Sequence, residues 1–308
     1  MIQISDFTKR YGTLVAVDRL NLRIERGQTF GFIGPNGAGK TTTIRFLATL
    51  VRPTSGEATI LGHSVTRQPL EVRRLVGYMP DSFGLYEGMR VGEFLDLFAA
   101  GYGIPRDRRK GVIEYTMERL GLSSKRTAKV TKLSRGMKQR LCLAKTLLHD
   151  PPVLILDEPA NGLDPQARAE LKSLFRQLRE AGKTIVLSSH VLSELADCCT
   201  TIGIIDRGKL LLHGPMDNVY AQIHCNRIVQ IRFLENLEAG LRVLHAEPGV
   251  RAVHTDGNEV IIERAGDDQQ LADLLERLVA AGARVCSFAA QEPTLEDVFL
   301  SVTRKAVG

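Results

Sequence analysis

Short apolar runs alternate with helix-like segments over the first 222 residues of the chain. The continuous apolar run at 153–156 is typical of a strand buried on both faces of a parallel sheet, and further apolar strands are expected at 29–33 and 184–188. Helices are expected at 41–50, 91–102, 106–120 and 136–149. This order of elements predicts an α/β domain.

The pattern changes in the last part of the chain. Apolar and polar residues alternate at 229–233 as in a strand, and the sequence DGN at 256–258 lies between two strand-like runs as a hairpin turn. Leucines at 271–278 recur at helical spacing, with Asp267 or Asp268 as a start and Gly282 as a stop. A strand at 284–288 and a helix around 294–303 would complete a small α+β domain.

Length and charge support two domains. A chain of 308 residues can build a core without disulfides or metals. Residues 226–308 carry 9 Lys and Arg against 13 Asp and Glu, a net charge of −4, whereas residues 1–225 carry 32 against 22, a net charge of +10. We therefore expect domains at 1–222 and 223–308. The basic first part suits a nucleotide, an anionic membrane surface or nucleic acid, and charge alone does not choose among them.

The cysteines and the apolar runs bear on location. No apolar run approaches the roughly 20 residues that span a bilayer, and the N-terminus has no signal-peptide pattern. A membrane function would therefore need another polypeptide to do the spanning. An odd number of cysteines without C-x-x-C spacing indicates small packed side chains in a reduced, cytoplasmic compartment. The five are Cys142, Cys198, Cys199, Cys225 and Cys286.

Residues 34–42, GPNGAGKTT, match a phosphate-binding loop between a strand and a helix. The glycines let backbone N–H groups turn toward an anion, with the N-terminus of the following helix behind them. Lys40 would reach the β- and γ-phosphates, and the Thr41 hydroxyl would bind Mg²⁺. The alternative is a glycine-rich turn with an incidental lysine.

Two acidic residues follow the apolar run at 153–156. Asp157 and Glu158 would lie at the carboxyl end of a buried strand, where α/β sheets bind ligands. Asp157 would hold Mg²⁺, and Glu158 would orient and deprotonate the attacking water. Alternatively, the two acids only begin a turn before Pro159.

A third segment, LSRGMKQR at 133–140, narrows the class of ATPase. With it, the chain resembles the ATP-binding subunits of ABC transporters over about residues 1–220. This resemblance implies a P-loop NTPase fold in which a helical subdomain carries the signature. The matching elements occur in the family's order: Tyr11 in KRYG, Walker A at 34–42, the signature at 133–140, Walker B at 153–158, the D-loop ANGLD at 160–164, and the switch histidine His190 in SSH.

The resemblance implies an ATP site shared between two copies of the chain. Tyr11 would stack on adenine, and His190 would contact the γ-phosphate. Ser134 and Gly136, at the start of a helix, would contact the γ-phosphate bound to the opposite chain, although Ser134 can also be an ordinary helix cap. A histidine after a core strand can also be purely structural. The residues expected to bind ATP are Tyr11, Gly34, Pro35, Asn36, Gly37, Ala38, Gly39, Lys40, Thr41, Thr42, Ser134 and Gly136.

Two motifs depart from the family pattern. Asp81 stands where the family has glutamine, and its carboxylate can still bind Mg²⁺ through water. Arg135 and Met137 replace the commoner Gly and Gln, and Arg135 adds positive charge near phosphate. We still expect an active ATPase. Its catalytic residues would be Glu158, His190 and Lys40, and its metal-binding residues would be Thr41, Asp157 and Asp81.

Two further segments bear on partners. Aromatic and apolar residues around the helix at 91–102 either line a groove for a helix of a membrane subunit or pack within the helical subdomain. These are Phe83, Leu85, Tyr86, Phe94 and Phe98. The sequence EPTLEDVFL at 292–300 resembles the tail of ATPases that serve type-2 ABC export systems, including antibiotic and multidrug exporters.

The leading hypothesis is an ATPase subunit that dimerises on ATP and drives export by a separate integral-membrane permease. It would be cytoplasmic, at the inner face of the cell membrane through that permease. A second class is a soluble ABC-type ATPase acting on nucleic acid or ribosomes. No nucleic acid is expected, because aromatic residues are not interleaved with the basic ones. A third is a nucleotide-gated regulator that hardly hydrolyses, against which Glu158 and His190 argue.

Overall fold

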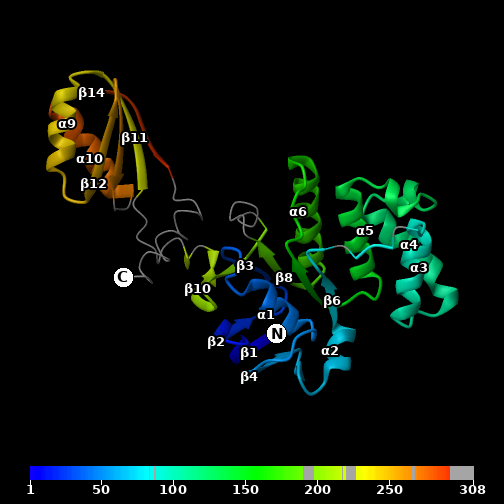
Figure 1. The fold of residues 1–308 in the computed structure, drawn as a ribbon. Coiled ribbons are helices and arrows are strands. Elements are labelled where there is room, and N and C mark those ends of the chain that lie inside the picture. The colour runs from blue at the N-terminus through cyan, green and yellow to red at the C-terminus, as the bar shows by residue number, and fades with distance from the viewer. Residues whose placement is uncertain are drawn as a thin grey trace. The chain divides into compact units, whose positions relative to one another are not determined.

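A computed structural model gives the fold of the protein (Figure 1) and describes residues 1–82, 84–86, 88–189, 198–216, 218–219, 227–264 and 268–291. The chain divides into two compact units, Met1–Met216 and Asp217–Gly308. The domain boundary expected at 222/223 falls among residues 220–226, outside the described residues, and stays a prediction. Within the described residues, no helix combines the length and the apolarity needed to cross a bilayer.

The first unit contains a mostly parallel sheet. Its six strands lie in the order β10 (Lys209–Pro215), β9 (Thr201–Asp206), β3 (Thr29–Ile33), β8 (Thr184–Ser189), β7 (Val153–Asp157) and β6 (Val76–Met79). Neighbouring strands are parallel, except that β10 is antiparallel to β9. β3, β7 and β8 are buried along their whole length, which confirms the three strands expected from the apolar runs.

An antiparallel sheet, which the sequence analysis did not anticipate, belongs to the same unit. Its strands lie in the order β2 (Leu14–Ile24), β1 (Ile2–Tyr11), β4 (Ser55–Ile60) and β5 (His63–Ser64). Register shifts interrupt the pairing of β1 with β2 after Ile4, Phe7 and Lys9. These shifts break the strict apolar alternation by which a half-buried strand is read from sequence.

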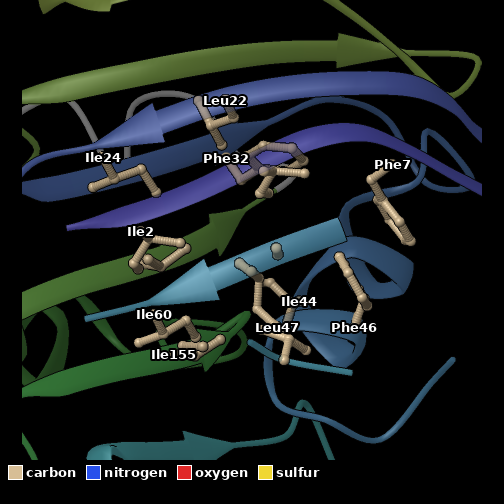
Figure 2. Packing of buried hydrophobic residues seen from close by; sticks show 14 of the residues in the cluster. Ile2, Phe7, Leu22, Ile24, Phe32, Ile44, Phe46, Leu47, Ile60 and Ile155 are labelled. Carbon is tan, nitrogen blue, oxygen red and sulfur yellow. The ribbon is translucent and has the colours of Figure 1, made fainter. Parts of the chain in front are cut away.

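Side chains from both sheets and from α1 (Lys40–Leu47) form one buried core (Figure 2). The antiparallel sheet supplies Ile2, Leu22, Ile24 and Ile60, and the parallel sheet supplies Phe32 and Ile155. Phe7 of β1 stacks on Phe46 of α1 with ring centroids 4.0 Å apart. This packing fixes α1, and with it the end of the loop at 34–42, against both sheets. The helix was expected to reach residue 50 but ends at Leu47.

Three helices form an arm in the same unit (Figure 1). They are α3 (Val91–Gly101), α4 (Arg106–Arg119) and α5 (Arg135–Leu147), with short 3₁₀ turns η1 (Ser123–Lys125) and η2 (Val130–Lys132) between α4 and α5. All three helices lie within two residues of their expected ranges. Phe94 is fully buried and contacts the ring of Phe98, so the packing interpretation holds for Phe94. Tyr86 is 55% exposed beside both rings, and Phe83 lies outside the described residues.

Two more helices complete the described part of the first unit, α2 (Pro69–Leu75) and α6 (Pro165–Glu180). Proline stands at the start of each, where its missing N–H costs nothing. The Asp164 carboxylate accepts a hydrogen bond of 2.8 Å from the Ala167 N–H and so caps α6.

In the described residues, the second unit consists of a four-stranded antiparallel sheet and two helices. The strands lie in the order β12 (Val250–Asp256), β13 (Glu259–Arg264), β11 (Arg227–Glu235) and β14 (Arg284–Gln291), and the helices are α9 (Leu237–Ala246) and α10 (Asp268–Ala280). The hairpin turn at 256–258 and the helix over the leucines at 271–278 are confirmed. The sequence analysis missed α9. The helix expected around 294–303 lies outside the described residues.

A buried ion network lies beside the core of the second unit. The Glu247 carboxylate accepts hydrogen bonds of 2.8 Å from both Arg264 and Arg277. Arg264 also donates to the backbone carbonyl of Gln270 at 2.6 Å. The side chains of Arg264 and Glu247 are only 5% and 8% exposed, so this pair is largely removed from water. The Arg264 Nε has no partner among the described residues.

The cysteines follow the expectation only in part. Cys142, Cys198 and Cys199 are buried and reduced. Cys286 is exposed on β14, the edge strand of its sheet, so the expectation of burial is wrong there. Its thiol donates to the Arg232 carbonyl at 3.2 Å. Cys225 lies outside the described residues.

Candidate functional site

The glycine-rich loop at 34–42 is shaped by backbone atoms of both sheets. A Cβ on Gly34 would lie 2.2 Å from the Ile205 carbonyl oxygen of β9, and one on Gly39 would lie 2.6 Å from the Ala16 carbonyl oxygen of β2. Gly37 and Gly39 also have φ angles of 82° and 109°, which strongly favour glycine. Only a loop without side chains at these points can occupy this space.

The rest of the loop divides into an anchored part and an exposed part. The Ala38 carbonyl accepts a hydrogen bond of 3.0 Å from the Gly208 N–H, in the turn between β9 and β10. Pro35, Asn36 and Gly37 are exposed, and Thr41 and Thr42 are half-buried. The structure thus presents the middle of the loop to solvent while holding its ends, as a phosphate cradle requires.

Lys40 folds back over this loop. Its ammonium donates to the Gly34 carbonyl at 2.6 Å and to the Pro35 carbonyl at 3.1 Å, and it lies 3.9 Å from the Glu158 carboxylate. The side chains of Lys40 and Glu158 are 5% and 11% exposed. Burial lowers the pKa of Lys40, and the neighbouring carboxylates oppose that shift. The structure therefore brings Lys40 and Glu158 together at the loop.

Asp157 lies at the centre of a hydrogen-bond cluster. One of its carboxylate oxygens, Oδ1, accepts from the Ser188 hydroxyl at 2.6 Å and from the Thr41 hydroxyl at 3.2 Å. Ser188 is opposite Asp157 in the parallel pairing of β7 with β8, so the sheet register sets the contact. The same serine oxygen accepts a hydrogen bond of 3.0 Å from the Glu158 N–H.

The sequence analysis did not identify Ser188 as part of the site. The signal available was its place in the SSH segment, two residues before His190. His190 itself lies outside the described residues, and its predicted contact stays a prediction.

The geometry around Asp157 fits a magnesium ion. Its second oxygen, Oδ2, is buried and has no hydrogen-bond partner among the described residues. Mg²⁺ prefers such oxygen ligands and is usually held by one or two protein groups together with water and phosphate.

Glu158 follows Asp157 in an uncommon backbone conformation. Its φ of 51° is left-handed, a region that costs a residue with a side chain of order 1–3 kcal/mol. Hydrogen bonds at 3.0 Å to Ser188 and at 3.1 Å from the Asn161 N–H to the Glu158 carbonyl hold this conformation. The turn carries the chain away from β7 while leaving the carboxylate near Lys40.

Asp81 and Tyr11 are less closely tied to the cluster. Asp81 is exposed. Burial raises the pKa of Tyr78, and the carboxylates of Asp157 and Asp81 raise it further, so both acids act on the same phenol. Tyr11, at the end of β1, is 47% exposed, and the Lys9 ammonium lies 4.9 Å from its ring centroid. An exposed ring of this kind can stack on a base.

Ser134 and Gly136 begin α5. The Ser134 hydroxyl accepts a hydrogen bond of 3.3 Å from the Met137 N–H, so it is an N-cap, as one interpretation predicted. Ser134 is exposed, and its helix therefore offers a positive end to solvent. Gly136 lies close to the Leu163 side chain. A Cβ added at Gly136 would be 3.5 Å from the nearest Leu163 atom. The cap does not exclude a phosphate contact, since the remaining N–H groups of the first turn stay available.

Sequence comparisons connect this site to known proteins. A family profile described as ABC transporter matches residues 17–161, and one described as ATP-binding protein DrrA1-3-like, C-terminal domain, matches residues 214–303. The bacitracin transport ATP-binding protein BcrA of Bacillus licheniformis is 37% identical over 98% of this chain and 97% of its own length. The daunorubicin resistance ATP-binding protein DrrA3 of Streptomyces coeruleorubidus is 35% identical over 98% of this chain and 95% of its own length.

Solved structures agree with the fold. A structure of an ATP-binding subunit of an ABC transporter superposes with a TM-score of 0.66 at 29% identity, covering 72% of this chain and 92% of that one. The cbiO1 protein of Clostridium perfringens, part of an ABC transporter complex, gives a TM-score of 0.66 at 25% identity, covering 72% of this chain and 90% of that one. These relatives give no support to the nucleic-acid alternative.

The phosphate loop, the acids at the end of β7 and the capped signature helix lie in the fold expected of such proteins, and similarity to two relatives extends over almost the whole chain. The protein is an ATPase of the ABC transporter family.

Proposed function

We propose that the chain is the ATP-hydrolysing subunit of an exporter, that it dimerises on ATP, and that it drives a separate integral-membrane permease. The observation that carries the proposal is the extent of the similarity, which spans both units in relatives named for bacitracin transport and daunorubicin resistance. The DrrA-like C-terminal profile favours export over import. We infer an antibiotic or another drug-like molecule as cargo.

ATP would bind with its phosphates over the loop at 34–42 and its adenine on Tyr11. Lys40 would exchange the Gly34 and Pro35 carbonyls for phosphate oxygens, which explains why its ammonium is held on the loop. Thr41 and Asp157 would hold Mg²⁺, with Asp81 acting through water. When bound, Mg²⁺ would neutralise charge on the β- and γ-phosphate oxygens.

Hydrolysis would depend on Glu158. Its carboxylate would orient a water for attack on the γ-phosphate and accept the proton that this water loses. The left-handed backbone and the Ser188 hydrogen bond support this carboxylate in one position. His190, in the segment after β8, would contact the γ-phosphate and register its departure.

Two chains would close around two nucleotides. The exposed N-terminus of α5, with Ser134 and Gly136, would meet the γ-phosphate held by the partner's loop, because backbone N–H groups and the helix dipole favour an anion there. Loss of the γ-phosphate would remove that contact and let the dimer open. Opening and closing would be transmitted to the permease at the inner face of the cell membrane.

The first test is ATP-driven dimerisation. Glu158→Gln should bind MgATP and accumulate as a dimer of twice 34.0 kDa in light scattering, because hydrolysis no longer opens it. Glu158→Gln combined with Lys40→Ala should stay monomeric and serves as the matched control. A monomer at saturating MgATP, even beside the permease, contradicts the proposal.

The second test concerns the membrane partner. A tagged copy of the chain purified from detergent-solubilised membranes should retain an integral-membrane protein. Deletion of the chain should increase sensitivity to at least one compound of an antibiotic panel. Recovery of the chain without any membrane protein, together with unchanged sensitivity, would count against a transport role.

A further inference from the structure

Arg135 is the first residue of α5 and stands directly after Ser134, yet its side chain turns toward a different loop. Its guanidinium donates to the Asn161 backbone carbonyl at 3.3 Å. It also lies against Gly162, since a Cβ there would come within 2.4 Å of Cζ and 2.6 Å of both Nε and Nη2. Gly162 has a φ of 71° and is exposed. The arginine therefore occupies the space that any side chain at position 162 would need.

The contacted loop carries the catalytic candidate Glu158. It runs from Glu158 to Asp164, where the aspartate caps α6. Within it, the Asn161 N–H donates to the Glu158 carbonyl at 3.1 Å, and the Leu163 N–H donates to the Ala160 carbonyl at 3.2 Å. Both ends of this loop are thus fixed, by β7 and by the cap. The hydrogen bond from Arg135 to the Asn161 carbonyl also restrains the middle of the loop.

Apolar packing and an ion pair continue the same connection. Gly136 lies beside Leu163 and Ala167, whose atoms are 3.5 and 3.9 Å from the position of an added Cβ. Further along the two helices, Arg140 of α5 pairs with Glu170 of α6. The first turns of α5 are therefore packed against the loop at 158–164 and against the start of α6.

We propose that Arg135 is a positioning residue that joins the helix end contacting one nucleotide to the glutamate loop serving the other. This inference rests on the proposed function, in which Ser134 meets the partner's γ-phosphate while Glu158 acts on the chain's own nucleotide. Closure on the partner's nucleotide would then align Glu158 through Arg135, Asn161 and the turn between them. Each ATP site would sense the occupancy of its twin.

The test is a steady-state ATPase titration of Arg135→Ala. We expect kcat to fall roughly ten- to a hundredfold, because a small misplacement of the general base is costly. KM should change less than about twofold, and a Hill coefficient above 1 in the native protein should fall toward 1. Arg135→Lys keeps a donor without the guanidinium fork, so it should recover part of the loss. Arg106→Ala, an exposed arginine at the start of α4, should behave as the native protein.

A double-mutant cycle tests the contact itself. Gly162→Ala should lower kcat through both its φ and the clash with the guanidinium. In the Arg135→Ala background the clash is gone, so the second substitution should cost less than it does alone. Strict additivity of the two losses would overturn the proposal, as would an Arg135→Ala variant whose kcat and Hill coefficient stay within about twofold of native.

Dimerisation separates this inference from the proposed function. Arg135→Ala placed in the Glu158→Gln background should still dimerise on MgATP with little change in affinity. If the Arg135→Ala, Glu158→Gln double variant loses dimerisation while Glu158→Gln keeps it, Arg135 contacts the partner's nucleotide directly and the positioning role is wrong. If Glu158→Gln fails to dimerise by itself, the proposed function has failed instead.

Discussion

Each unit of this protein buries a glutamate beside a basic side chain, but the two pairs are built differently. In the second unit, Glu247 and Arg264 lie 2.8 Å apart, with Arg277 on the same carboxylate. In the first unit, Glu158 and Lys40 are 3.9 Å apart, next to an Asp157 oxygen that has no partner among the described residues. The first pair is closely hydrogen-bonded, whereas the second is more widely spaced and lies at the site proposed for ATP and Mg²⁺.

The same substitution in both pairs sharpens this comparison. Glu158→Gln should lower kcat by about 10²–10⁴-fold, because it removes the proposed general base. The free energy of unfolding without nucleotide should change by less than about 1 kcal/mol, since the amide preserves shape. Steady-state ATP hydrolysis measures kcat, and chemical denaturation measures the free energy of unfolding. A large loss of stability would place Glu158 with Glu247 as a structural carboxylate.

Glu247→Gln should do the reverse. Neutralising one partner leaves Arg264 buried without its counter-charge, which typically costs about 3–5 kcal/mol. Hydrogen exchange in β11 and β13 should accelerate. Affinity of the first unit for MgATP should stay unchanged, and Glu238→Gln, on exposed helix surface, provides the control. Loss of ATP binding in Glu247→Gln would show that the Glu247 pair does more than stabilise the second unit.

Ser188→Ala tests the hydrogen bonds that the Ser188 hydroxyl makes with Asp157 and Glu158. The variant removes a donor to the charged Asp157 and an acceptor from the Glu158 N–H, and a hydrogen bond to a charged group is worth about 1.5–3 kcal/mol. We expect kcat to fall roughly ten- to a hundredfold on that basis. Ser123→Ala, at an exposed serine, should have no effect. An unchanged kcat would show that Ser188 only supports the strand pairing.

The half-buried carboxylate of Glu57 should show the smallest effect of these substitutions. Hydrogen bonds from Ser64, Thr66 and Arg67 lower the pKa of Glu57 from 4.5 to about 2. Because the folded-state pKa is depressed, the stabilisation is complete above pH 4.5 and is lost as pH falls from 4.5 to about 2. Its size should stay below about 1 kcal/mol, since the ion pair with Arg67 faces water.

Urea titrations of native protein and Glu57→Gln check this window. The variant should be less stable at neutral pH, and the difference should shrink at about pH 3. If the stability difference between native protein and Glu57→Gln grows as the pH falls, the pKa of Glu57 is not lowered in the folded state and the prediction is wrong. If Glu57→Gln lowers the free energy of unfolding as much as Glu247→Gln does, solvent exposure does not determine how much these carboxylates stabilise the fold.

Strands and motifs with local signals were predictable from the sequence. β3 and β7 are buried on both faces and read as continuous apolar runs, and the loop between β3 and α1 carries its own glycine pattern. The antiparallel sheet was not anticipated, because the register shifts after Ile4 and Phe7 disturb its alternation. α9 was missed although its residues are amphipathic, and its left-handed Asn236 is not a standard helix start.

The candidate site shows the same limit. Lys40, Thr41, Asp157 and Glu158 were identified from motifs, and the structure brings them together. The Ser188 contacts depend on the pairing of β7 with β8, and the Arg135 contact depends on how α5 lies against the loop at 158–164. Neither relation is encoded in the spacing of residues along the chain.

The carbonyls of Ile205 and Ala16 that crowd the phosphate loop also limit how this protein can evolve. No side chain can be added at Gly34 or Gly39 without moving a strand of one sheet or the other. A substitution at either glycine should therefore impair the loop, whatever molecule is exported. A change of cargo would therefore have to arise at positions other than these two, so the same loop can serve different transport tasks.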